Sequence, residues 1–271
     1  SAEAERLARR RARRSAANAR KVSGSLRRLI GQLLRRDWSP DEIRGYLDRF
    51  GHVLASVPTI YSQIRRNRQA GGELHEHLRY GKRRPLWGRP SSGGLPKERT
   101  SIRHRPATIE QRRRPGDWEG DTLNGSRAQT HRLLTLVDRY SRFLKLRHPQ
   151  NGQSLSERIA NTAIDALADL PSHSITFDNG SEFAAFAKIA RGLDCSIYFA
   201  DTHSPWQRGT CENTIGLLRQ YIPKGTSGRH LTNAQLQAIE NKLNNRPRKC
   251  LGYKTPAEVL LGADPPVALR T

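Results

Sequence analysis

Apolar residues recur three and four positions apart between residues 25 and 36, which predicts an α-helix with one buried face. A second helix is predicted from Ser39-Pro40-Asp41-Glu42, because serine caps a helix, proline suits its first turn and glutamate completes a capping box. A third is predicted to begin near Ser56 and to become basic around residues 65 to 68. This pattern is typical of a helix-turn-helix, and also of an ordinary three-helix bundle with a basic surface.

A different pattern begins at residue 117. Three apolar runs have the length of strands: 118–123, 132–138 and 141–146. The sequences Asn124-Gly125 and Arg139-Tyr140 between them predict hairpin turns. Alternating helices and strands follow, at 155–170, 174–177, 182–190 and 196–199, and then helices at 206–220, 232–244 and 256–261. This order predicts an α/β fold with a mixed five-stranded sheet flanked by helices, preceded by an all-α helix-turn-helix region.

Positive charge is concentrated in the first part of the chain. The 271 residues include 48 Lys and Arg against 25 Asp and Glu, a formal net charge of +23. Residues 1–116 hold 29 of these basic residues and only 10 of the acidic ones. A polyanion is therefore the expected partner, and nucleic acid is favoured over a membrane surface. We divide the chain into a basic helical region with the helix-turn-helix at 1–80, a basic linker at 81–112, and a core with C-terminal helices at 113–271.

Composition argues against several classes of protein. No apolar run approaches the about 18 residues that cross a bilayer, and the Arg-rich start lacks the apolar segment of a secretory signal. The three cysteines are far apart and predict neither a disulfide framework nor a zinc site, so a reducing cytoplasm is expected. The sequence contains no methionine, and we expect that a segment preceding residue 1 is missing.

Three carboxylates stand out by their positions. Asp121 lies in the first predicted strand of the core, Asp178 follows the fourth, and Glu212 lies on the helix after the fifth. Each has an ordinary explanation alone, as a strand-end, turn or solvated helix residue. Carboxylates that cluster repel one another unless a cation neutralises them, and magnesium prefers such oxygen ligands. Two such ions about 3.5–4 Å apart can activate a nucleophile and stabilise the leaving oxygen of a phosphodiester.

The sequence around these acids resembles a known family. Asp178 and Glu212 have 33 residues between them, within TFDNGSEF at 176–183 and HSPWQRGTCENTIGLLRQYIPKG at 203–225. Further matching stretches are GDWEGD (116–121), LVDRYSRF (136–143) and LNNRPRKCLGYKTPAEV (243–259), with DWSPDEIRGYL (37–47) and PTIY (58–61) upstream. Together these stretches resemble the DDE transposases and retroviral-type integrases, and most closely the bacterial insertion sequence thirty family.

The resemblance implies an integrase-type catalytic core with a ribonuclease-H-like fold. It implies that Asp121, Asp178 and Glu212 bind two Mg²⁺ ions, for which Mn²⁺ could substitute. They would catalyse cleavage at insertion-element ends and strand transfer of the 3′-hydroxyl into target DNA. The implied partners are double-stranded DNA, as element ends and target, and further copies of the chain, as a dimer or larger homo-oligomer. No membrane is implied, and the expected location is the bacterial cytoplasm, associated with the nucleoid. The family usually has another helix-turn-helix before residue 1.

Other residues are candidates for binding or support. DNA contacts are predicted for Thr59, Arg65, Arg66, Arg68, Arg208, Arg219 and Lys224. Asn179 and Asn213 are predicted to support the neighbouring carboxylates, although turn chemistry and a surface amide explain them equally well. Strand alternation places Glu119 on the same face as Asp121, so Glu119 is the strongest competitor for its role. The resemblance decides for Asp121.

Two further features have ordinary explanations, and two other functions remain open. Trp206 is expected to be a packing residue. His75 and His77 are expected in a polar helix or loop rather than in a metal site. A DNA-binding relic or regulator without catalysis is the first alternative, and the three acids disfavour it. A structure-selective nuclease on the same core is the second, and the helix-turn-helix disfavours it.

Overall fold

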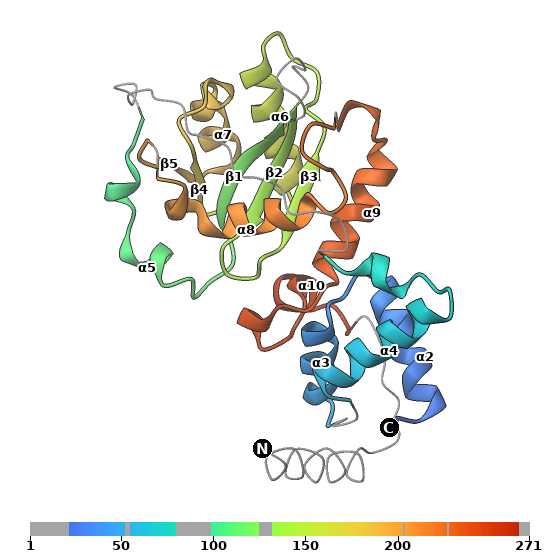
Figure 1. Ribbon diagram of the computed structural model, residues 1–271. Coiled ribbons are helices and arrows are strands. Elements are labelled where there is room, and N and C mark those ends of the chain that lie inside the picture. The colour runs from blue at the N-terminus through green and yellow to red at the C-terminus, as the bar shows by residue number, and fades with distance from the viewer. Residues whose placement is uncertain are drawn as a thin grey trace, which may run out of the picture. The chain divides into compact units, whose positions relative to one another are not determined.

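The computed structural model describes residues 22–51, 55–79, 99–124, 132–202, 204–226 and 228–265. The chain divides into two compact units, Ser1–Gly81 and Lys82–Thr271, which are drawn in Figure 1. Among the described residues, no helix has both the length and the apolar character needed to cross a membrane.

The described residues of the first unit form short helices, and a serine caps the start of each α-helix. These are α2 (Gly24–Arg35), α3 (Pro40–Arg49), α4 (Val57–Gln69) and the 3-10 helix η1 (Leu74–His77). Ser39 and Glu42 form the predicted capping box at the start of α3. Ile30, Ile43 and Ile60 are fully buried, so each of the three α-helices contributes one apolar stripe to a common core.

The second unit is built on a five-stranded sheet with the strand order β3-β2-β1-β4-β5. The strands are β1 (Asp117–Asn124), β2 (Arg132–Asp138), β3 (Leu144–Arg147), β4 (Ser174–Phe177) and β5 (Ser196–Phe199). The first three pair antiparallel, whereas β4 pairs parallel with both β1 and β5. This is the mixed five-stranded sheet predicted from the sequence, in a ribonuclease-H-like order.

Helices cover both faces of the sheet (Figure 1). On one face α6 (Leu155–Leu167) and α7 (Phe186–Leu193) pack on a core that includes Trp118, Leu136 and Phe177. On the other face α8 (Gly209–Leu218) and α9 (Asn233–Asn244) pack on a core that includes Leu123, Val137 and Leu146. Because side chains alternate along a strand, β1 sends Trp118 to the first face and Leu123 to the second.

Several predicted boundaries differ from those in the structure. Residues 141–143 lie outside β3, after a turn at 139–141 in which Asp138 accepts hydrogen bonds from the backbone N (2.6 Å) and Oγ (2.5 Å) of Ser141. The helices predicted at 182–190 and 206–220 are each interrupted. The first is η3 (Ser181–Phe183) and α7, and the second is η4 (Pro205–Arg208) and α8. The turn predicted at Asn124-Gly125 leads into residues 125–131, outside the described part of the chain.

The last part of the predicted linker packs against the sheet. It contains η2 (Ile102–His104) and α5 (Ala107–Glu110), and its Ile102 and Ile109 are buried. The backbone N of Phe199 on β5 donates to the Thr100 carbonyl at 2.9 Å. The buried apolar residues and the backbone hydrogen bond attach residues 99–112, the end of the predicted linker, to the second unit. The remaining short elements are η5 (Gly228–His230), η6 (Lys249–Leu251) and α10 (Pro256–Leu261).

Candidate active site

Two of the three predicted acids converge on one arginine. Asp121 lies on β1, on the face that α8 covers, and Asp178 directly follows β4, the parallel neighbour of β1. Arg208, at the start of α8, donates from Nη1 to Asp121 Oδ2 at 2.9 Å and from Nη2 to Asp178 Oδ2 at 3.5 Å. The guanidinium also donates to the Gly120 carbonyl at 3.1 Å. The sheet and the helix thus bring two carboxylates to one positive charge.

The two carboxylates differ in burial, because the side chain of Asp121 is largely buried and that of Asp178 is 40% exposed. Desolvation and, to a smaller extent, the charge of Asp178 raise the pKa of Asp121, while Arg208 lowers it; the net effect is a rise from 3.8 to about 6. Burial alone would lower the pKa of Arg208, but Asp121 and Asp178 raise it above its usual value. Arg208 therefore stays charged. Arg208 supplies the positive charge in this arrangement, and the two carboxylates are hard oxygen donors of the kind that a divalent metal ion prefers.

Glu212 lies on the first turn of α8, four residues after Arg208, and is partly buried. In the described residues, no three His, Cys, Asp or Glu side chains are grouped so that they could hold one metal ion. The structure therefore brings Asp121 and Asp178 to the guanidinium of Arg208 and places Glu212 on the adjacent helix. A ligand role for Glu212 remains a prediction.

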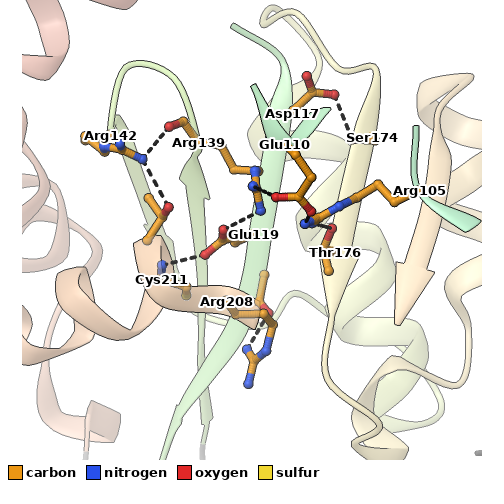
Figure 2. A network of polar contacts seen from close by, with 12 residues as sticks. Arg105, Glu110, Asp117, Glu119, Arg139, Arg142, Ser174, Thr176, Arg208 and Cys211 are labelled. Atoms are coloured by element: carbon orange, nitrogen blue, oxygen red, sulfur yellow. Dashed lines mark hydrogen bonds and ion pairs between the residues drawn. The ribbon is translucent and has the colours of Figure 1, made fainter. Parts of the chain in front are cut away.

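Glu119 was the strongest alternative to Asp121 as a site residue, but both of its carboxylate oxygens accept hydrogen bonds within the protein. It is completely buried, and its Oε1 accepts from Arg139 Nη1 at 2.8 Å. Its Oε2 accepts from the backbone N of Cys211 on α8, also at 2.8 Å (Figure 2). Asp117, two residues earlier, is likewise occupied, by Ser174 Oγ at 2.7 Å and Arg114 Nε at 3.1 Å. Of the three acids on this face of β1, Asp121 is the one that pairs with Arg208.

Comparisons with known proteins agree with this geometry. The integrase core domain family matches residues 111–205. The transposase for insertion sequence element IS4351 of Bacteroides fragilis is 40% identical over 243 residues, which are 88% of this chain and 73% of that protein. The chain belongs to the insertion sequence thirty family of DDE transposases. Its function class is therefore DNA transposition.

Two more distant relationships complete the comparison. Transposase InsI for insertion sequence element IS30C of Escherichia coli is 38% identical over 250 residues, 87% of this chain and 64% of that protein. The chain therefore spans just under two thirds of this relative. A chain of the simian T-cell lymphotropic virus intasome in complex with PP2A regulatory subunit B56 gamma is 18% identical, with a TM-score of 0.43. That match covers 75% of this chain and 72% of the viral one.

The residues predicted to contact DNA differ in how far they are exposed. Arg208 is buried between the aspartates, so in this arrangement its guanidinium is not on the surface where a phosphate contact was predicted. Arg219 follows α8 and is half-buried; burial lowers its pKa and the charge of Asp121 opposes this. Lys224 is exposed. In the first unit Arg65, Arg66 and Arg68 are exposed along α4, whereas Thr59 is partly buried and its Oγ1 lies 2.8 Å from Ser56 Oγ.

The supporting residues and the tryptophan also differ from one another. Asn179 donates from Nδ2 to the Ala200 carbonyl at 2.7 Å, which fixes the loop that carries Asp178. Asn213 is exposed on α8. The expectation that Trp206 packs in the core is wrong, because 74% of its surface is exposed. His77, at the end of η1, has its Nδ1 2.9 Å from Asp37 Oδ1, an ordinary polar pair.

Sequence reasoning did not identify the basic and acidic residues that surround the site. Arg105 and Arg139 are buried, and both bind Glu110 on α5. Glu182, in the stretch after Asp178, is buried and accepts from Thr122 Oγ1 at 2.9 Å and from Arg132. The one available signal was the presence of charged residues within otherwise apolar strands and turns, which is rare unless the charges are paired.

Proposed function

We propose that Asp121, Asp178 and Glu212 hold two Mg²⁺ ions in this transposase, with Mn²⁺ able to substitute. The proposed reactions are cleavage at the ends of an insertion element and transfer of the 3′-hydroxyl ends into target DNA. The observation that supports this most directly is the buried Arg208 between Asp121 and Asp178. Two carboxylates held close together repel one another, and a family whose chemistry uses divalent ions gives them a purpose.

The chain's own residues would prepare the site in defined ways. Asp121 and Asp178 present oxygen ligands from the neighbouring strands β1 and β4, and Glu212 presents another from α8. Arg208 stabilises the ionised form of Asp121, which burial opposes. Bound divalent ions activate the attacking oxygen and stabilise the leaving oxygen of the phosphodiester. In this scheme no side chain forms a covalent bond to DNA.

The DNA would be held mainly by positive charge. We assign the helix-turn-helix of the first unit, with Arg65, Arg66 and Arg68, to the element ends, and Lys224 to the phosphates near the core. Joining two ends to one target requires a dimer or a larger assembly of this chain on the bacterial nucleoid. Because phosphate contacts release condensed counterions, DNA affinity is expected to fall steeply as the salt concentration rises.

A strand-transfer assay tests the proposal. The purified chain is mixed with pre-cut element ends and a supercoiled plasmid, with and without Mg²⁺. Asp178→Asn is expected to lower joining at least about a hundredfold, because an ion contributes several kcal/mol to the transition state. Its DNA affinity should stay within about twofold of the wild type, since the basic surface is unchanged. The matched control is Asp165→Asn, which removes an exposed acid from α6 on the opposite face of the sheet.

Two outcomes would overturn the proposal. If Asp178→Asn still joins DNA, the assignment of the site is wrong. If the wild-type chain binds DNA but joins no ends in either Mg²⁺ or Mn²⁺, the non-catalytic DNA-binding protein becomes the better description.

A further inference from the structure

A chain of paired charges, in which Glu119, Arg139 and Arg105 are buried and Glu110 is exposed, leads from the sheet to the start of α8. Glu119 on β1 binds Arg139, and Arg139 Nη2 donates to Glu110 Oε2 at 3.0 Å. Glu110 also binds Arg105, whose Nη1 donates to Thr176 Oγ1 on β4 at 3.0 Å. We call these five residues the Glu119 network; they are shown in Figure 2. Two acids and two arginines balance in charge, as paired buried groups require.

Each end of this network lies next to a proposed metal ligand. Glu119 precedes Asp121 by two residues on β1, and Thr176 precedes Asp178 by two residues at the end of β4. On the helix side, Glu119 accepts the backbone N–H of Cys211, the residue immediately before Glu212. The three elements that carry the proposed ligands are therefore tied together by one set of hydrogen bonds.

The bond to Cys211 has a specific effect on α8. The first N–H groups of a helix have no partner within the helix, and a carboxylate is their best partner. No side chain at the N-cap position, Arg208, supplies such a bond. Glu119 supplies it from the neighbouring strand. It is reinforced by Arg142 Nη1, which donates to Thr210 Oγ1 at 3.1 Å.

We propose that Glu119 is a positioning residue, which fixes the first turn of α8 and thereby sets Glu212 against Asp121 and Asp178. The segment 101–110 belongs to the same hydrogen-bond network through Arg105 and Glu110, although it lies just before the residues that the integrase core family matches. This inference rests on the proposed function, because it gives Glu212 its role. It adds a residue that touches neither DNA nor metal and that acts through the helix.

The test compares two buried acids of the same strand. In Glu119→Gln the side chain keeps its shape but retains only one acceptor oxygen, so it can serve Arg139 or Cys211 but not both. The matched control is Asp117→Asn, which removes a buried carboxylate whose hydrogen bonds go to Arg114 and to Ser174 on β4. Hydrogen exchange of the α8 amides, Mn²⁺ affinity by electron paramagnetic resonance, DNA affinity and strand transfer are measured for both variants.

Glu119→Gln is expected to speed exchange in the first turn of α8 about tenfold and to weaken Mn²⁺ binding and strand transfer by at least about tenfold, a 1.4 kcal/mol effect. DNA affinity should not change. Asp117→Asn should leave the exchange of α8 and the affinity for Mn²⁺ as in the wild type. A loss of general stability alone would affect both variants, so the contrast between them distinguishes positioning from support of the fold.

A second variant covers the case in which Glu119→Gln does not fold. Glu110 is 57% exposed on its side chain, so Glu110→Gln is tolerated by the fold and loosens Arg139 from the outside. Like Glu119→Gln, it should speed amide exchange in the first turn of α8 and weaken both Mn²⁺ binding and strand transfer. If the variant that folds has normal α8 exchange and normal Mn²⁺ affinity, the inference is overturned. The proposed function is tested separately, by the joining activity of Asp178→Asn.

Discussion

Asp121 is expected to make the stability of the protein depend on pH in a defined window. Burial raises its pKa from 3.8 to about 6 in the folded chain. A raised pKa means that the folded state holds the proton more tightly than the unfolded state. The stabilisation is thus fully present below about pH 3.8 and is lost as the pH rises through about 6. Two pKa units correspond to about 3 kcal/mol.

The assay compares denaturant unfolding of the wild type and Asp121→Asn between pH 4 and pH 7 in the presence of EDTA. The variant cannot titrate at this position, so the difference between the two free energies of unfolding isolates Asp121. The wild type should lose about 2.4 kcal/mol relative to the variant as the pH rises from 4 to 7, because the unfolded carboxyl is already partly ionised at pH 4. Asp165→Asn, an exposed change, should give a curve parallel to the wild type.

A divalent ion should reverse this loss. At pH 7 and a concentration about 100 times the dissociation constant, a ligand that binds only the folded state adds about 2.7 kcal/mol of stability. The wild type should gain this from Mg²⁺, and Asp121→Asn should gain much less. A difference curve without slope between pH 4 and 7, or one of opposite sign, would refute the assignment of a raised pKa to Asp121.

Two further predictions concern single positions near the site. Gly120→Ala should destabilise the core by about 1–3 kcal/mol in thermal melts, because a Cβ there would lie 2.2 Å from the buried ring of Phe177; Gly209→Ala, with nothing within 4 Å, is the control, and equal effects would contradict this reasoning. The exposed indole of Trp206 should be quenched when the chain binds element ends, because bases stack on exposed aromatic rings. A Trp206→Phe variant should lose most of that change, and an unchanged emission would place this loop away from the DNA.

The strands of the fold were predictable because their apolar runs are continuous. The bounds of β2, β4 and β5 are those expected from the sequence, and an aspartate closes each run, as Asp138, Asp178 or, one residue further on, Asp201. Residues 141–143 were assigned to a strand because Phe143 and Leu144 look alike as apolar residues. Their turn depends on the side chain of Asp138, and hydropathy does not record a hydrogen bond of that kind.

The acids of the candidate site could be named from the sequence, but their surroundings could not. Asp121 and Asp178 come together because β1 and β4 pair in parallel, which a strand list does not reveal. The position of Arg208 between them, and the capping of α8 by Glu119, join residues about 90 positions apart. Trp206 was misplaced because a tryptophan is usually buried, and only its neighbours in space show that this one is not.

The parallel pairing of β4 with β1 also determines at which stage of folding the candidate site is assembled. β1, β2 and β3 form a local antiparallel unit, whereas β4 reaches β1 only after the α6 crossover, and α8 is added later still. Contacts between residues far apart in sequence form late in folding. On the ribosome Asp121 emerges first and Glu212 last, so an unfinished chain holds at most part of the proposed ligand set. With the proposed ligands arranged in this order, the enzyme could cut no DNA before its synthesis has passed Glu212.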